Sequence, residues 1–157
     1  GYPVVAVDRS EQALGAIADL AAATHGPRVQ AVLADLENGA WPLMQGGAEA
    51  TFDGVVVTNY LWRALLPTIV RSVAPGGVLL YETFAHGNAS VGKPARPDFL
   101  LQPGELLQAC RELRIVAYED GFCADPARFV QRIAAVRTPP AGPCPVADGA
   151  PPRRYPL

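Results

Sequence analysis

Short apolar runs alternate along the chain with segments of helical spacing. Four of these runs, built from β-branched, aliphatic and aromatic residues, lie at 3–7, 29–33, 53–58 and 78–84. Val55, Val56 and Val57 are consecutive, so the third run has apolar side chains on both faces, as a buried parallel strand does. The pattern predicts four strands, of which the third is covered on both sides.

A helix is predicted after the first strand. Ser10 can serve as its N-cap, and Glu11 in the first turn suits the helix dipole. The apolar residues that follow recur at helical spacing and form one face, at Ala13, Ile17, Leu20 and Ala21. Gly26-Pro27 then predicts the end of the helix.

Two further helices are predicted, at 66–73 and 103–110. Pro67 suits the first of these only if it lies in the first turn, where its missing N–H costs nothing. The second helix is expected to turn Leu106 and Leu107 inward.

The C-terminal third predicts a change of strand direction. Residues 74–77, Ala-Pro-Gly-Gly, predict a turn before the fourth strand. The β-like segments 114–119 and 128–136 flank a short polar turn, which predicts an antiparallel hairpin. We therefore predict an α/β domain over residues 1–137, with a mostly parallel sheet and a terminal antiparallel hairpin. Residues 138–157 contain seven Pro and two Gly and are predicted to form a separate tail.

Composition narrows the functional classes. At 157 residues the chain fits one domain, and 13 basic against 15 acidic residues supply no basic surface for gripping nucleic acid by bulk charge. No apolar run reaches the roughly 18 residues of a membrane span, and no basic-then-apolar leader opens the sequence. Cys110, Cys123 and Cys144 are too widely spaced for a zinc site or a disulfide framework, so no metal is expected. Three unpaired thiols are typical of a reducing compartment, so we expect the protein in the cytoplasm.

Polar residues follow the predicted strands at their carboxyl ends, where open α/β sheets bind ligands. The Asp8 carboxylate could accept hydrogen bonds from two ribose hydroxyls, or it could be an ordinary turn acid. Asp35 and Leu36 could clamp an adenine ring, with a loop acid as the alternative. Asn59, followed by Tyr60, could offer an amide to a zwitterion or simply form a turn.

His86 lies in a polar loop at 85–102, after the fourth strand. An imidazole titrates near neutral pH and could act there as a general base. A purely structural role for this lone histidine is the competing interpretation.

The order of these segments resembles the class I S-adenosylmethionine-dependent methyltransferases. The similar motifs are VVAVDRS at 4–10, VLADLE at 32–37, FDGVVVTNYLWR at 52–63 and APGGVLLYETF at 74–84. The stretch HGNASVGKPARPDFLLQPGEL at 86–106 resembles a loop of the bacterial branch related to tellurite-resistance methyltransferases. The resemblance covers residues 1 to about 137.

This resemblance implies methyl transfer from S-adenosylmethionine to a small-molecule acceptor on a Rossmann-like sheet. The implied cofactor-binding residues are Asp8 with Arg9 at the ribose, Asp35 and Leu36 at the adenine, and Asn59 and Tyr60 at the methionine. A general base is optional for this reaction and depends on the acceptor, with His86 as the candidate. The loop at 85–102 is long and rich in Gly and Pro, so we expect it to recognise the acceptor through His86, Asn88 and Arg96.

The sequence departs from the family at one point. The family's glycine-rich loop and first strand lie upstream of the segment that matches residues 1–10, and Gly76-Gly77 precede their strand and cannot replace that loop. We therefore expect the sheet to be N-terminally incomplete here and to be completed by an upstream segment or a partner chain. A nicotinamide-dependent oxidoreductase and a catalytically silent interaction module remain the alternatives.

Overall fold

The computed structural model describes residues 2–23 and 28–139, which divide into two compact units at Ala50 and Thr51. Each unit is described by itself. The predicted end of the first helix at Gly26-Pro27 lies outside the described residues, as does the predicted tail beyond residue 139.

The first unit is built on two parallel strands. They are β1 (Val4–Asp8) and β2 (Val29–Leu33), joined through helix α1 (Glu11–Ala23). Ser10 Oγ accepts a hydrogen bond of 3.2 Å from the backbone N–H of Ala13, which confirms the predicted N-cap.

The apolar face predicted for α1 is largely uncovered. Leu14 is buried, whereas Ile17 and Leu20 are 40% and 65% exposed. A pair of five-residue strands offers a helix of 13 residues only a narrow surface, so part of its apolar stripe extends past the strands of this unit.

A short hairpin that the sequence pattern did not predict closes the first unit. Strands β3 (Met44–Gln45) and β4 (Ala48–Glu49) pair antiparallel. Gly46 and Gly47 both have positive φ, at 59° and 84°, the backbone that a two-residue turn of the mirror-image type requires.

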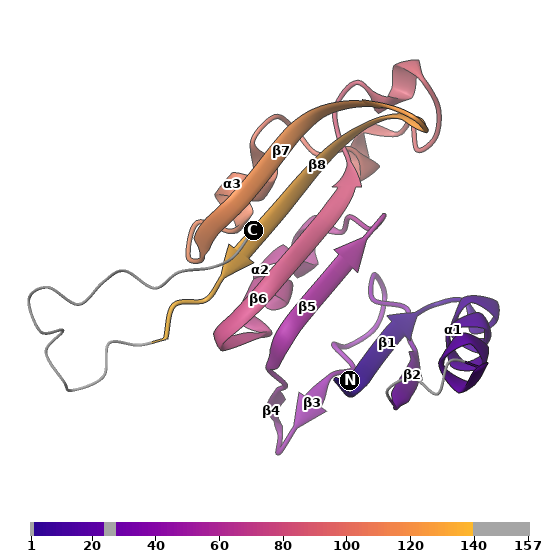
Figure 1. Cartoon of the computed structure of the whole chain (residues 1–157), viewed down its shortest axis with the longest axis vertical. Helices are drawn as coiled ribbons and strands as arrows, with labels where there is room; N and C mark the ends of the chain where they lie inside the picture. The colour runs from indigo at the N-terminus through magenta and orange to yellow at the C-terminus, as the bar shows by residue number, and fades with distance from the viewer. Residues whose placement is uncertain (1, 24–27, 140–157) are drawn as a thin grey trace, which may run out of the picture. The chain divides into compact units, whose positions relative to one another are not determined.

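The second unit contains a four-stranded mixed sheet in the order β5-β6-β8-β7 (Figure 1). Strands β5 and β6 are parallel, while β8 pairs antiparallel with both β6 and β7. Its elements are β5 (Phe52–Thr58), η1 (Arg63–Leu65), α2 (Leu66–Arg71), β6 (Val73–Phe84), η2 (Asn88–Ser90), η3 (Pro97–Phe99), α3 (Glu105–Ala109), β7 (Arg114–Ala124) and β8 (Ala127–Val136). The predicted α/β class and the terminal antiparallel hairpin are confirmed.

Helices α2 and α3 lie on the same face of this sheet, behind it in the view of Figure 1. Their apolar residues form one buried cluster with inward residues of β6 and β8, including Ile69, Leu106, Leu79, Tyr81 and Ile133. The opposite face is open: Val56 is 67% and Leu80 is 47% exposed. The prediction that β5 is covered on both faces is therefore wrong within this unit, because both helices pack on one side.

Two local predictions are also corrected. Residues 74–77 form part of β6 rather than a separate turn, and the irregularity persists as a register shift, with Phe52 opposite Val73 but Gly54 opposite Val78. Gly77 is required there, because a Cβ would lie 2.9 Å from the carbonyl oxygens of both Ala74 and Phe52.

Leu107 is 39% exposed, while Leu106 is fully buried. Adjacent residues of a helix point about 100° apart, so a helix of five residues cannot bury both against one face of the sheet.

Candidate functional site

In the first unit, Asp8 and Asp35 lie at the carboxyl ends of two paired parallel strands. Asp8 ends β1 opposite Leu33, the last residue of β2, and Asp35 follows two residues later. Both side chains are exposed, as is that of Arg9. Parallel pairing therefore brings the two predicted cofactor-binding acids to one edge, as the sequence predicts.

Asp8 already takes part in the turn that opens α1. Its Oδ1 accepts a hydrogen bond of 2.8 Å from the backbone N–H of Ser10, and its backbone carbonyl accepts one of 3.0 Å from Ala34. An ionised carboxylate has about four acceptor sites, so this turn bond leaves capacity for a ligand. The turn role and the ligand role are compatible at this residue.

Asp35 is held by its own loop. Its Oδ2 accepts from the Asn38 side-chain amide at 2.9 Å, and its Oδ1 accepts from the backbone N–H of Glu37 at 3.0 Å. These bonds favour the ionised form and lower the pKa of Asp35, with the Asn38 amide as the largest cause. Leu36 beside it is half-buried.

Trp41, in the first unit, carries a polar group that lacks a partner within the described part of the chain. Its indole N–H is buried, and among the described residues it has no hydrogen-bond partner. A buried donor without a partner is uncommon and marks a place where an acceptor would be favourable.

In the second unit, Asn59 and Tyr60 follow β5. Asn59 has a φ of 52°, in the left-handed region that asparagine tolerates, and its N–H donates to the Glu82 carbonyl at 2.9 Å. Tyr81 Oη donates to the Tyr60 carbonyl at 2.9 Å, and burial raises the pKa of Tyr81. The segment after β5 is thus fixed to β6.

The predicted acceptor residues fall into two environments in the loop at 85–102. His86 is exposed, and its backbone N–H donates to Leu101 at 2.8 Å. Arg96 is also exposed, pairs with Asp98 at 2.9 Å and lies over the Phe99 ring at 5.1 Å.

Asn88 is 1% exposed and holds the loop from within. Its Nδ2 donates to the Pro94 carbonyl at 3.0 Å, and its Oδ1 accepts from the Phe129 N–H at 3.1 Å. In this conformation the Asn88 amide supports the loop, and an acceptor would meet His86 and Arg96 before it. The acceptor contacts stay predictions.

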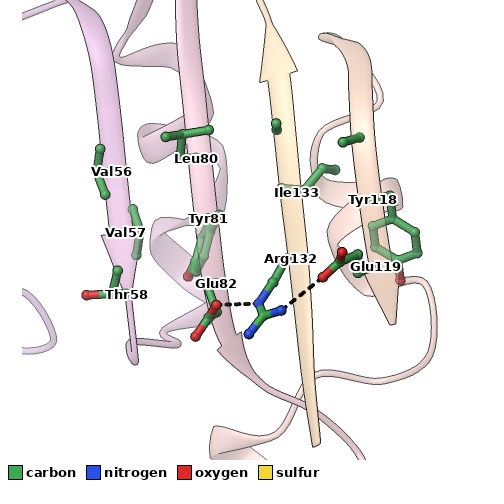
Figure 2. Close-up of a pocket in the computed structure, with 12 residues that line it drawn as sticks. Val56, Val57, Thr58, Leu80, Tyr81, Glu82, Tyr118, Glu119, Arg132 and Ile133 are labelled. Atoms are coloured by element: carbon green, nitrogen blue, oxygen red, sulfur yellow. Dashed lines mark hydrogen bonds and ion pairs between the residues drawn. The ribbon is translucent and has the colours of Figure 1, made fainter. Parts of the chain in front are cut away.

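A groove of about 410 Å³ crosses the open face of the sheet (Figure 2). Val56, Leu80 and Ala134 form its apolar floor, and a charged row from Glu82 through Arg132 to Glu119 crosses it. Arg132 donates to Glu82 and, at 3.0 Å, to Glu119, while Arg128 pairs with Glu82 at 3.1 Å. The two carboxylates raise the pKa of Arg132, Glu119 contributing most.

Sequence reasoning did not single out this charged row. Its signal is a charged residue at an outward position of each of three strands, and the row becomes visible once the antiparallel register places Arg132 opposite both acids. Each arginine pairs with an acid of this row, although Arg128 Nε is buried and has no hydrogen-bond partner among the described residues, so the row is a cross-strand pairing of the open face.

Residues 2–23 and 28–139 contain neither a metal-binding cluster nor a membrane-spanning helix. No cluster of three or more His, Cys, Asp or Glu side chains there could hold a metal ion. No helix in those ranges is long and apolar enough to cross a membrane.

Comparison with known proteins gives matches among solved structures. No family model matches the chain, and no curated protein does. TehB from Haemophilus influenzae aligns with a TM-score of 0.64 at 17% identity, over 88% of this chain and 51% of TehB. The N-methyltransferase NodS from Bradyrhizobium japonicum aligns with a TM-score of 0.59 at 15% identity, over 85% of this chain and 72% of NodS.

The cyclase SpnF aligns as closely, with a TM-score of 0.61 at 14% identity, over 87% of this chain and 66% of SpnF. NodS has also been solved in complex with S-adenosylhomocysteine. At these identities the alignments establish the fold, which is the Rossmann-like fold of class I S-adenosylmethionine-dependent methyltransferases. The chain spans about half the length of TehB, and a cyclase on the same fold means that the fold alone does not define the reaction.

Proposed function

We propose that the chain is part of an S-adenosylmethionine-dependent methyltransferase that acts on a small-molecule acceptor. The observation that carries this proposal is the pair of exposed carboxylates, Asp8 and Asp35, at the carboxyl ends of two paired parallel strands in a chain of this fold. The structural similarity to NodS, an N-methyltransferase by name, supports the reaction class.

The residues fit the chemistry of the cofactor. The Asp8 carboxylate keeps acceptor capacity for vicinal ribose hydroxyls, with Arg9 exposed beside it. The lowered pKa keeps Asp35 ionised, which suits acceptance of a hydrogen bond from an exocyclic amine, and half-buried Leu36 offers an apolar surface for a ring. Asn59 and Tyr60, held to β6 by a backbone bond to Glu82 and by the Tyr81 hydroxyl, would line the methionine side.

Bound S-adenosylmethionine supplies a methyl group on a sulfonium sulfur, and in-line transfer breaks that S–C bond while a bond to the acceptor nucleophile forms. Alignment and exclusion of water are the protein's main contributions to such a step. His86, whose side chain is exposed two residues after the end of β6, would take the proton of an acceptor whose nucleophile carries one. Asn88 and Arg96 complete the proposed acceptor loop.

We also propose that a further strand pairs with β5, supplied by a segment outside this sequence or by a partner chain. Among the described residues, β5 pairs with β6 alone. Its Val55-Val56-Val57 run is typical of an interior parallel strand, and no lysine or proline blocks its outer edge.

Calorimetric titration of the full-length protein with S-adenosylhomocysteine and with NAD tests the proposed cofactor. We expect saturable heat with S-adenosylhomocysteine and none with NAD. Binding of NAD alone would assign an oxidoreductase, and binding of neither would leave a silent module.

A further inference from the structure

Arg63 makes a bidentate ion pair across the second unit. It lies in η1, five residues after the end of β5, and its Nε donates to Glu105 Oε1 at 2.7 Å. A second guanidinium nitrogen donates to Glu105 Oε2 at 2.9 Å. Two parallel bonds to one carboxylate fix both planar groups in orientation, which a single contact does not do.

The same guanidinium holds the end of the acceptor loop. Its Nη1 donates to the Asp98 carbonyl at 2.8 Å, and its Nη2 donates to the Leu100 carbonyl at 2.9 Å. Glu105 Oε2 also accepts from the backbone N–H of Gln102 at 2.8 Å. One arginine therefore joins the segment after β5, the last residues of the loop at 85–102 and the start of α3.

Two other side chains join the loop at 85–102 to β8. Asn88 ties the loop to Phe129 in β8. Gln131, fully buried in β8, donates to the Gln102 carbonyl at 2.6 Å and accepts from the Leu106 N–H at 3.1 Å. These two residues anchor the loop to the core, whereas Arg63 connects it to the segment that begins with Asn59 and Tyr60.

We infer that Arg63 is a positioning residue that couples the cofactor-side segment after β5 to the acceptor loop after β6. The inference rests on the proposed function, because that function places the cofactor at 59–60 and the acceptor at 85–102. Parallel β5 and β6 end at the same edge of the sheet. A shift of the segment after β5 is therefore transmitted to the loop after β6 through the hydrogen bonds of the Arg63 guanidinium to Asp98 and Leu100. Cofactor binding would then order the acceptor loop before the acceptor arrives.

Amide hydrogen exchange of the full-length protein, with S-adenosylhomocysteine as the probe, tests this coupling. In the wild type we expect the ligand to slow exchange both at 59–65 and at 85–102. In Arg63→Met we expect slowing at 59–65 only, with loop exchange at least tenfold faster than in the wild type and ligand affinity changed less than threefold.

Two further variants separate coupling from general destabilisation. Arg63→Lys keeps the charge but loses the planar fork, so we expect only partial restoration of the loop response. Arg111→Met, at an exposed arginine in the same unit, is expected to behave as the wild type does. Faster exchange throughout β6 and β8 in Arg63→Met, with the loop response intact, would assign Arg63 a structural role only.

The outcomes for the coupling and for the proposed function differ. A ligand response in the wild type that persists in the loop of Arg63→Met refutes the coupling and leaves the cofactor proposal standing. Lack of any response in the wild type refutes the cofactor proposal, and the coupling with it.

Discussion

Backbone N–H groups hold the two acids that the proposed cofactor site needs. Ser10 donates to Asp8, and Glu37 donates to Asp35. Such bonds orient a carboxylate while leaving lone pairs for a ligand. At the residue scale, each of these two carboxylates can therefore stabilise its turn and bind a ligand at the same time.

Asp8→Ala should weaken S-adenosylhomocysteine binding by about 1.5–3 kcal/mol, the range for hydrogen bonds to a charged group. The free energy of unfolding should fall by no more than about 1 kcal/mol, because one exposed turn bond is lost. Calorimetry and urea denaturation measure the two effects, with Asp19→Ala, at an exposed acid of α1, as control. An unchanged affinity would leave Asp8 as a turn acid alone.

Titration of Glu105 tests whether the ion pair between Arg63 and Glu105 forms in solution. Burial acts to raise the pKa of Glu105, but hydrogen bonds from Arg63 and from Gln102 outweigh it, so this pKa lies below the ordinary value of a glutamate. Because the folded pKa is lowered, the stabilisation from this pair is present above the unfolded pKa and is lost as pH falls through the folded value.

In Arg63→Met the burial of Glu105 persists while its main opposing contact is gone. The pKa of Glu105 should then rise above that of the wild type. Carbon-13 NMR titration of the Glu105 carboxyl group measures both values. An equal pKa in the two proteins would mean that the ion pair does not form in solution.

At the scale of elements, the acceptor loop depends on backbone that only glycine adopts easily. Gly87 has a φ of 101°, and a Cβ there would lie 3.1 Å from the Phe129 ring. Gly92 in the same loop has open space around its Cα. The two glycines therefore form a matched pair.

Gly87→Ala should lower the free energy of unfolding by at least about 1–2 kcal/mol, the cost of a side chain in left-handed backbone, with the ring contact adding to it. Gly92→Ala should change it by less than about 1 kcal/mol and can even stabilise the protein through the unfolded state. Urea denaturation compares them. Similar losses in both variants would show that the loop conformation differs from the one described.

At the scale of the whole molecule, buried apolar area is concentrated in the second unit. The core cluster consists of residues between Leu61 and Ala135, and Leu14 is the buried apolar residue of the described part of the first unit. Local opening costs most where most apolar contacts break.

Amides of β6 and β8 should therefore exchange at least tenfold more slowly than those of β1 and β2. Amide exchange followed by NMR or mass spectrometry of the unliganded protein gives both rates. Equal protection of the two strand pairs would require the first unit to be buried by contacts outside those described here.

The residue pattern by itself determined the type and order of most elements. Apolar runs, the Ser10 cap and the tolerance of Pro67 in a first turn are local properties, and β1, α1, β2, β5, α2 and the terminal hairpin follow from them. The acids at the strand ends could also be placed, because parallel strands end at a common edge. The two-residue strands β3 and β4 were missed, since they are too short for a period to show.

The tertiary structure alone decided which distant residues meet. Arg63 and Glu105 are 42 residues apart, Asn88 and Phe129 are 41 apart, and Glu82 and Arg132 are 50 apart. The last of these pairings depends on strand order and register, which place β8 beside β6 and Arg132 opposite Glu82. Sequence periodicity sets which face a residue occupies but carries no information about its partner across the sheet. For that reason the acids at the strand ends were predictable from the sequence, and the ion pair between Arg63 and Glu105 was not.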